Sequence, residues 1–149
     1  MEVDEHFFEI LGNDRLMPHL HLSIQSGDAM ILKRMKRRHN PEDVNNFIER
    51  CRKVRKEITF GADIIAGFPT ENEGMFQNTY NLLNDNQISH LHIFPFSPKK
   101  NTPAARMPQL DKSIIKKRAQ DLRLLGDNIL SLVKKNLSNE RKILIEELN

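Results

Sequence analysis

Apolar residues along the chain alternate between the spacing of strands and the spacing of helices. Three short apolar runs, at 20–25, 58–66 and 88–94, are each followed directly by turn-forming residues that include Gly or Pro. Apolar runs of this length, bounded by turn residues, are typical of strands buried in a sheet. The pattern therefore predicts three strands.

Helical spacing separates these runs. Apolar residues recur three and four positions apart near 1–16, 28–35, 40–54 and 73–84, and again after Asp111. The third of these segments begins Asn-Pro-Glu-Asp, which supplies a capping side chain and a proline at the first helical position. The last one predicts a long helix, with a weak point at Gly126 and an apolar stripe made of Ile115, Ala119, Leu122, Leu125, Ile129, Val133 and Leu137.

Strands and helices follow one another in turn, which predicts consecutive βα units and a parallel sheet. The fold class is therefore α/β. Because 149 residues are short for a closed eight-stranded barrel, we expect a partial (β/α) barrel fragment with a long C-terminal helix. Residues 95–110 hold four of the seven prolines and are expected to form an irregular loop, whereas residues 142–146 read as the start of another strand.

Composition and charge narrow the class of protein. Apolar residues make up 38% and charged residues 29%, and no apolar run approaches the length of a membrane span. We therefore expect a cytoplasmic protein without a signal peptide. The net charge of +3 permits an anionic partner. The single cysteine, Cys51, excludes an internal disulfide, and we expect it to be half-buried on a helix.

Two His-x-His pairs, His19 with His21 and His90 with His92, could hold a metal ion because alternate strand residues share a face. Both pairs lie at the beginnings of their strands, whereas the ligands of α/β barrels collect at the carboxyl ends. We therefore expect polar packing at the barrel floor and no metal site. A zinc hydrolase that uses these histidines remains a further hypothesis for the function.

Candidate binding residues gather at the predicted carboxyl ends of the strands. An amide and a carboxylate that converge with bare glycine backbone could bind a polar cofactor such as a nucleoside, and phenylalanines could cover its apolar face. Plain turn formation explains these residues equally well. The candidates are Gln25, Ser26, Asp63, Gly67, Phe94, Phe96 and Ser97.

Basic residues cluster at 33–39, and Lys99, Lys100 and Arg106 follow on the proline-rich loop. Five cations within six residues could line a phosphate backbone, although a run of this kind is more often a solvated face. A second basic stretch, at 112–118, is weaker because acidic residues follow it on the same predicted helix.

Several motifs in their order and spacing resemble the radical S-adenosylmethionine methylthiotransferases. The sequences of the later motifs are most similar to those of the branch that methylthiolates threonylcarbamoyladenosine beside the anticodon of transfer RNA. The matching segments are Met17–Gly27, Met35–Arg38, Asp63–Glu71, His92–Pro98 and Thr102–Pro108.

The resemblance implies a partial barrel in which a [4Fe–4S] cluster cleaves S-adenosylmethionine to a 5′-deoxyadenosyl radical, which activates C2 of the adenine. It places Gln25, Ser26 and Asp63 around S-adenosylmethionine, with the Ile65–Gly67 backbone supporting its adenine. It also places Arg37 and Arg38 near the cofactor or the RNA. With Lys99 and Arg106 on the proline-rich loop, they form the candidate RNA contacts.

The chain departs from the family pattern at several points. The Cys-x-x-x-Cys-x-x-Cys loop of the radical cluster and the cysteines of an auxiliary cluster are missing from this sequence, and Asn72 and Asn101 stand where Thr and Gly are expected. Met1 resembles an internal start. We expect 1–110 to be the C-terminal half of the radical barrel, 111–139 a closing helix, and 140–149 the first part of an RNA-binding β-barrel.

Two functions of different class follow. The chain is expected to be a fragment of the transfer-RNA methylthiotransferase, inactive alone because Cys51 cannot supply three thiolates. The alternative is a non-catalytic remnant or split-protein half that binds RNA or a partner, for example an N-terminal half supplied as a separate chain.

Overall fold

The strands form where the apolar runs predict them. The computed structural model describes residues 4–136. Within them β1 (His19–Gln25), β2 (Thr59–Ala66) and β3 (His90–Pro95) form one parallel sheet in the order β1-β2-β3. The three runs lie side by side and point in the same direction, which confirms the α/β class and the partial barrel.

Helices occupy the segments between the strands. The strongest start is that of α3, where the Asn40 side chain accepts from the Asp43 N–H and the Asp43 carboxylate accepts from the Asn40 N–H. The helices are α1 (Glu5–Leu11), α2 (Ala29–Arg34), α3 (Pro41–Val54), α4 (Glu73–Asp85) and α5 (Lys112–Asn136).

The proline-rich loop is less irregular than predicted. It contains one short 3-10 helix, η1 (Pro103–Arg106), in which the Thr102 hydroxyl accepts from the Ala105 N–H. Proline at the first helical position lacks only a donor that would be unpaired there, so this residue starts the turn instead of preventing it.

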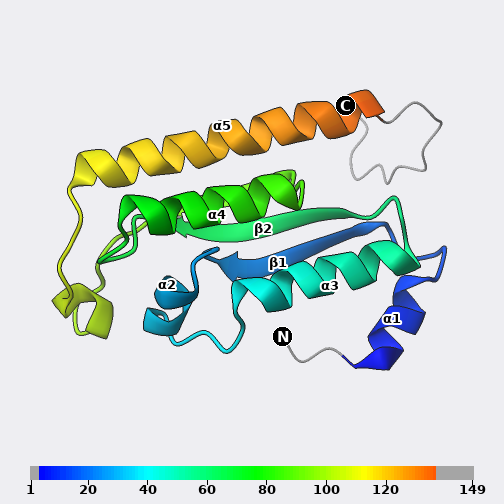
Figure 1. The fold of residues 1–149 in the computed structure, drawn as a ribbon, viewed down its shortest axis with the longest axis horizontal. Helices are drawn as coiled ribbons and strands as arrows, with labels where there is room; N and C mark the ends of the chain where they lie inside the picture. The colour runs from blue at the N-terminus through cyan, green and yellow to red at the C-terminus, as the bar shows by residue number, and fades with distance from the viewer. Residues whose placement is uncertain (1–3, 137–149) are drawn as a thin grey trace, which may run out of the picture.

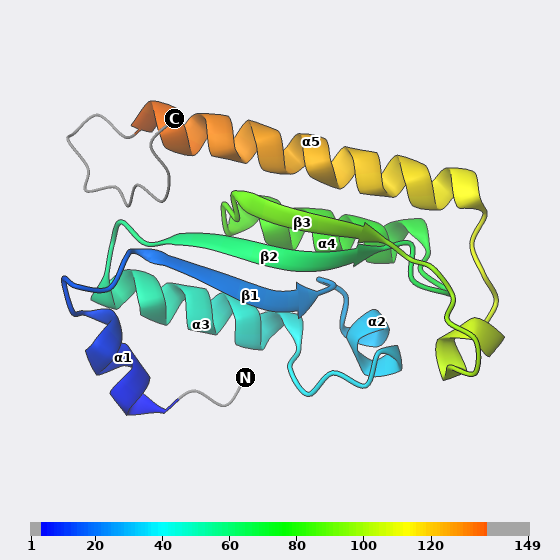
Figure 2. The same ribbon diagram turned by 180° about the vertical axis from the view of Figure 1, so that it is seen from behind.

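Within residues 4–136, the helices leave one face of the sheet uncovered. Figure 1 shows α3 and α4 on one side of the strands, with α5 alongside α4. Figure 2, from behind, shows the three strands in front of α3 and α4. Along β2, Phe60, Ala62 and Ile64 are fully buried toward the helices, because side chains alternate between the two faces. We call the other side the open face.

The long helix packs with the predicted stripe. Ile115, Ala119, Leu122, Leu125 and Ile129 are all buried. Gly126 is more than a weak point, because a Cβ there would lie 3.2 Å from the side chain of Leu91, so glycine allows α5 to approach β3 closely. The predicted residue Leu137 and the predicted strand at 142–146 lie outside the described residues.

Cys51 corrects one expectation. It is fully buried, not half-buried, because the apolar stripe of α3 that contains Val44, Phe47 and Ile48 carries it into the core. Among residues 4–136, no helix combines the length and the apolar character needed to span a membrane.

Candidate functional site

Three predicted contacts lie together near the carboxyl ends of the strands. Gln25 ends β1, and Ile65 of β2 pairs with Phe94 of β3. The β1–β2 register is irregular between Leu22 and Gln25, and Gln25 adopts a φ of 71°. Left-handed backbone costs a residue other than glycine roughly 1–2 kcal/mol, and such strain clusters at ligand sites. Because Phe94 is 52% exposed, its ring is open to a ligand.

Gly67 shapes the loop between β2 and α4. Its φ is +74°, and a Cβ would lie 2.7 Å from Ile115 of α5. The Gly67 N–H donates to Glu71 Oε1 over 3.2 Å, so the acidic side chain closes the turn over the glycine backbone. The predicted nucleoside-supporting backbone therefore adopts one conformation that only glycine fits without strain.

A buried ion pair, which the sequence analysis missed, fixes this turn to α5. Arg118 Nη1 donates to Glu71 Oε1 over 2.7 Å and to the Glu71 carbonyl oxygen over 3.0 Å, and both side chains are more than nine-tenths buried. Burial raises the pKa of the Glu71 carboxyl, while the Arg118 guanidinium and the Gly67 N–H act in the opposite direction. The only sequence signal was an acid before a helix and an arginine in a basic stretch, and neither revealed its partner.

Ser26 lies beside the cofactor candidates, but its side chain contacts α4. Its hydroxyl is within 3.2 Å of Thr79 Oγ1, which also accepts from the Gly27 N–H over 2.9 Å. Ser26 is 1% exposed, and a Cβ on Gly27 would lie 2.6 Å from Thr79 Cα. The Gln-Ser-Gly turn is thus packed tightly on α4, and this packing positions Gln25.

Asp63 lies elsewhere than expected. It is in the middle of β2, where Oδ1 is 2.9 Å from His21 Nε2 and 3.3 Å from His92 Nδ1. The hydrogen bond with His21 is the main cause that lowers the pKa of the Asp63 carboxyl. Asp63 was predicted among the carboxyl-end residues, although three residues follow it both in the predicted run 58–66 and in β2. The structure groups it with two histidines from the strand beginnings.

The four candidate RNA contacts are all exposed near the carboxyl end of the sheet. Arg37 and Arg38 follow α2, while Lys99 and Arg106 lie on the proline-rich loop. Figures 1 and 2 place α2 and this loop beyond the arrowheads of the strands. Cations from segments far apart in sequence thus face solvent at the same end of the molecule.

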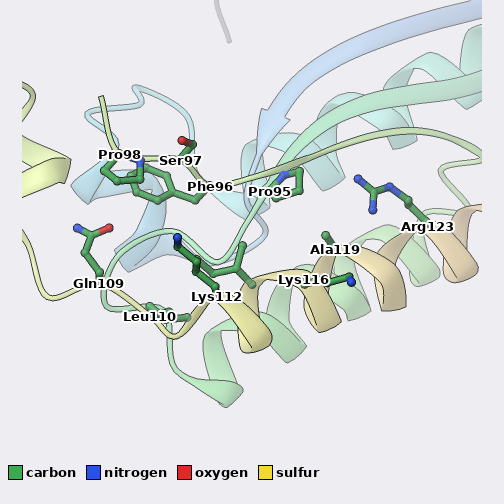
Figure 3. A pocket seen from close by; sticks show the side chains of 11 residues that line it. Pro95, Phe96, Ser97, Pro98, Gln109, Leu110, Lys112, Lys116, Ala119 and Arg123 are labelled. Carbon is green, nitrogen blue, oxygen red and sulfur yellow. The ribbon is translucent and has the colours of Figure 1, made fainter. Parts of the chain in front are cut away.

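A cavity of about 440 Å³ lies between α5 and the segment that follows β3 (Figure 3). Apolar groups of Pro95, Phe96 and Leu110 line it, and cations extend from α5, among them Lys112 and Lys116. The sequence predicts Phe96 and Ser97 at the strand ends but gives no indication of this cavity. Its lining includes none of Gln25, Ile65 or Gly67.

Cys51 does not fit a cluster ligand. Its thiol is buried in the core on α3, away from the carboxyl ends of the strands, and burial raises its pKa to about 11. An iron–sulfur cluster is held by several thiolates, and this sequence holds one cysteine. The residues present therefore do not fit a [4Fe–4S] cluster.

Comparison with known proteins matches residues 1–83 to the Radical SAM superfamily. The chain is 49% identical over 99% of its length to the threonylcarbamoyladenosine tRNA methylthiotransferase MtaB of Rickettsia prowazekii, and it covers 36% of that protein. It is 34% identical over 98% of its length to the protein of the same name from Bacillus subtilis, and it covers 33% of that relative.

A protein named for a different nucleoside also matches. The tRNA-2-methylthio-N(6)-dimethylallyladenosine synthase of Zymomonas mobilis is 38% identical over 89% of the chain, which covers 30% of that relative. The chain thus spans about a third of the length of these curated relatives.

Proposed function

The chain belongs to the Radical SAM superfamily and, within it, to the transfer-RNA methylthiotransferases, and from this membership we propose that it is the cofactor- and RNA-facing part of such an enzyme. The proposed activity of the whole enzyme is addition of a 2-methylthio group to N6-threonylcarbamoyladenosine beside the anticodon. The observation that carries the proposal is the 49% identity, along almost the whole chain, to a relative with that printed name.

The proposed S-adenosylmethionine contacts are the Gln25 amide, the backbone from Ile65 to Gly67, and the Phe94 ring. These groups lie at the carboxyl end of the sheet, where the Phe94 ring is exposed and the Gln25 side chain is buried, and an amide, bare backbone and an aromatic ring together suit a nucleoside. When bound, this cofactor supplies the methyl group and the adenosyl portion. The chain's own part is to bind and orient it, and the Arg118–Glu71 pair holds the Gly67 turn in place.

Ser26 and Asp63 are retained as predicted neighbours of the cofactor. The Ser26 hydroxyl already pairs with Thr79, so its proposed part is to position Gln25. Asp63 lies deeper in the open face, beside two histidines, so we propose for it at most an indirect contact.

The cluster must come from residues other than those of this sequence, because Cys51 is its one cysteine and is buried. We propose that a further polypeptide segment, joined to the chain or separate from it, supplies the thiolates. No radical step is therefore derived from the residues of this chain.

Cofactor binding tests the site. Calorimetric titration of the chain with S-adenosylmethionine should give one site, weakened at least about tenfold by Phe94→Ala or Gln25→Ala. The matched control is Leu124→Ala, because Leu124 on α5 is 53% exposed and Phe94 is 52% exposed. Equal affinity in all four proteins would reject the assigned pocket.

Complementation tests the activity. A strain that lacks the methylthiotransferase would receive the chain alone, a joined protein in which the chain replaces the matching segment of the Rickettsia relative, or that whole relative as a positive control. Mass spectrometry of transfer-RNA nucleosides should find 2-methylthio-N6-threonylcarbamoyladenosine only in the last two. Modification by the chain alone would refute its proposed dependence on another segment, and failure of only the joined protein would refute the proposed activity.

The second candidate is a non-catalytic module that binds RNA or a partner. The exposed cations Arg37, Arg38, Lys99 and Arg106 favour RNA as its ligand. RNA binding by the chain together with no effect of S-adenosylmethionine on its stability would favour this candidate.

A further inference from the structure

Three side chains on the open face come from three different strands and meet at one point. His21 belongs to β1, Asp63 to β2 and His92 to β3. Their potential ligand atoms all lie within 4.8 Å of one another. One carboxylate oxygen, Asp63 Oδ1, is 2.9 Å from His21 Nε2 and 3.3 Å from His92 Nδ1. Neighbouring strands, paired by backbone hydrogen bonds, fix the spacing of the three groups.

The backbone beneath the cluster leaves room for it. Gly61 lies on the same face of β2 as Asp63, and a Cβ there would lie only 2.6 Å from His21 Nδ1. A side chain at this position would displace the imidazole, so glycine allows the ring to lie over the sheet with Nε2 toward Asp63. The two rings are also close, with centroids 4.6 Å apart for His21 and His92.

We propose that His21, Asp63 and His92 form a binding site for one divalent transition-metal ion, with Zn²⁺ as the best match. Zn²⁺ binds histidine nitrogen and carboxylate oxygen at about 2.0–2.2 Å, which in a tetrahedral site places neighbouring ligand atoms roughly 3.3 Å apart. The two distances to Asp63 Oδ1, 2.9 and 3.3 Å, are close to that value, and all three ligand atoms lie within 4.8 Å of one another.

The open face leaves the fourth coordination position to water. The three side chains are 34%, 28% and 64% exposed, so an ion can enter without any opening of the core. Bound there, the ion would connect β1, β2 and β3 on the side that α3 and α4 do not cover. The site lies next to the proposed cofactor contacts, because the pair Asp63 and His92 precedes the pair Ile65 and Phe94 on the same two strands, but it does not depend on the proposed function.

The test uses the tag-free chain after treatment with a chelator. Titration with Co²⁺, followed by its visible d–d absorption, should show one ion per chain in a four-coordinate environment, and Zn²⁺ should displace it. Zn²⁺ should also raise the temperature midpoint of unfolding, because a ligand that binds only the folded state stabilises it.

The variants His92→Ala and Asp63→Asn should each weaken binding at least about tenfold. His6→Ala is the matched control, because His6 is exposed on α1 beside Glu9 and outside the cluster. Circular dichroism checks that each variant is folded, which the 64% exposure of His92 favours. Absence of a d–d signal in the wild-type chain, or equal affinity in wild type and both cluster variants, would overturn the proposal.

Discussion

Gly67 determines the conformation of the loop that carries the proposed nucleoside contacts. Its φ is +74°, and a Cβ at this position would lie 2.7 Å from Ile115, so both the backbone conformation and the space exclude a side chain at position 67. Gly67→Ala should therefore lower the free energy of unfolding by about 2–4 kcal/mol in urea titrations.

The control for this change is Gly74→Ala in the first turn of α4. A Cβ there meets only Asn72 Oδ1, at 3.5 Å, so helix propensity should make the variant up to about 1 kcal/mol more stable. If Gly67→Ala proved as stable as Gly74→Ala, the described conformation of the loop would be incorrect.

Cys51 should be unreactive while the chain is folded. Its thiol is buried with a pKa raised to about 11, so alkylation at pH 8 should proceed at the rate of unfolding and become fast in denaturant. The rate of modification by iodoacetamide, measured by mass spectrometry with and without urea, checks this expectation.

The raised pKa also gives a direction for the pH dependence. The pKa of the Cys51 thiol in the folded state lies above the value of 9.0 for a free thiol. The contribution of the buried thiol to the free energy of unfolding is therefore fully present below pH 9 and is lost as pH rises toward 11. Relative to Cys51→Ala, the wild-type chain should lose unfolding free energy across this interval. A difference between the two proteins that stays constant from pH 8 to pH 11 would contradict the burial of the thiol.

At the scale of elements, one ion pair connects α5 to the loop after β2. Arg118→Met leaves the Glu71 carboxylate buried without its guanidinium, and we expect a loss of about 3–5 kcal/mol in unfolding free energy. Lys117→Met, the exposed neighbour on α5, should change stability by less than about 0.5 kcal/mol.

The loss of unfolding free energy in Arg118→Met should become smaller as pH falls. Burial raises the pKa of Glu71, so protonation favours the folded state as pH drops through the folded pKa, and it also removes the unpaired charge. The double variant Glu71→Gln/Arg118→Met should be more stable than Arg118→Met alone. If it were less stable, the contribution of Arg118 would come from packing rather than from charge.

The elements themselves were predictable because local periodicity determines them. The apolar stripe from Ile115 to Ile129 and the Asn40 cap predicted α5 and α3 without reference to the rest of the chain. The groupings across elements were not predictable. Nothing local shows that Arg118 reaches Glu71 or that Asp63 meets His21, because these contacts depend on strand register and helix docking.

At the scale of the whole molecule, cations from two distant segments share the carboxyl end of the sheet. We expect the chain to bind an RNA anticodon stem-loop with a marked salt dependence. Arg37→Gln/Arg106→Gln should reduce the slope of log K against log salt by roughly 1.4–1.8, since two phosphate contacts are lost.

The matched control removes the same number of positive charges from the opposite end of the sheet. Lys53 and Lys56 are exposed near the end of α3, beside the beginnings of the strands, so Lys53→Gln/Lys56→Gln should leave the slope nearly unchanged. Fluorescence anisotropy of labelled RNA at several salt concentrations measures both slopes. Equal reductions in the two double variants would mean that binding follows net charge and not this edge.

The two faces of the sheet have different neighbours, and this separates two kinds of mutation. Side chains of β1 and β2 toward α3 and α4 form the core, whereas alternate positions such as His19, His21 and Ser23 face outward. Residues at these outward positions can therefore be substituted with little effect on folding. A library confined to them would vary ligand preference on a constant scaffold, which makes the chain a suitable starting point for engineered binding proteins.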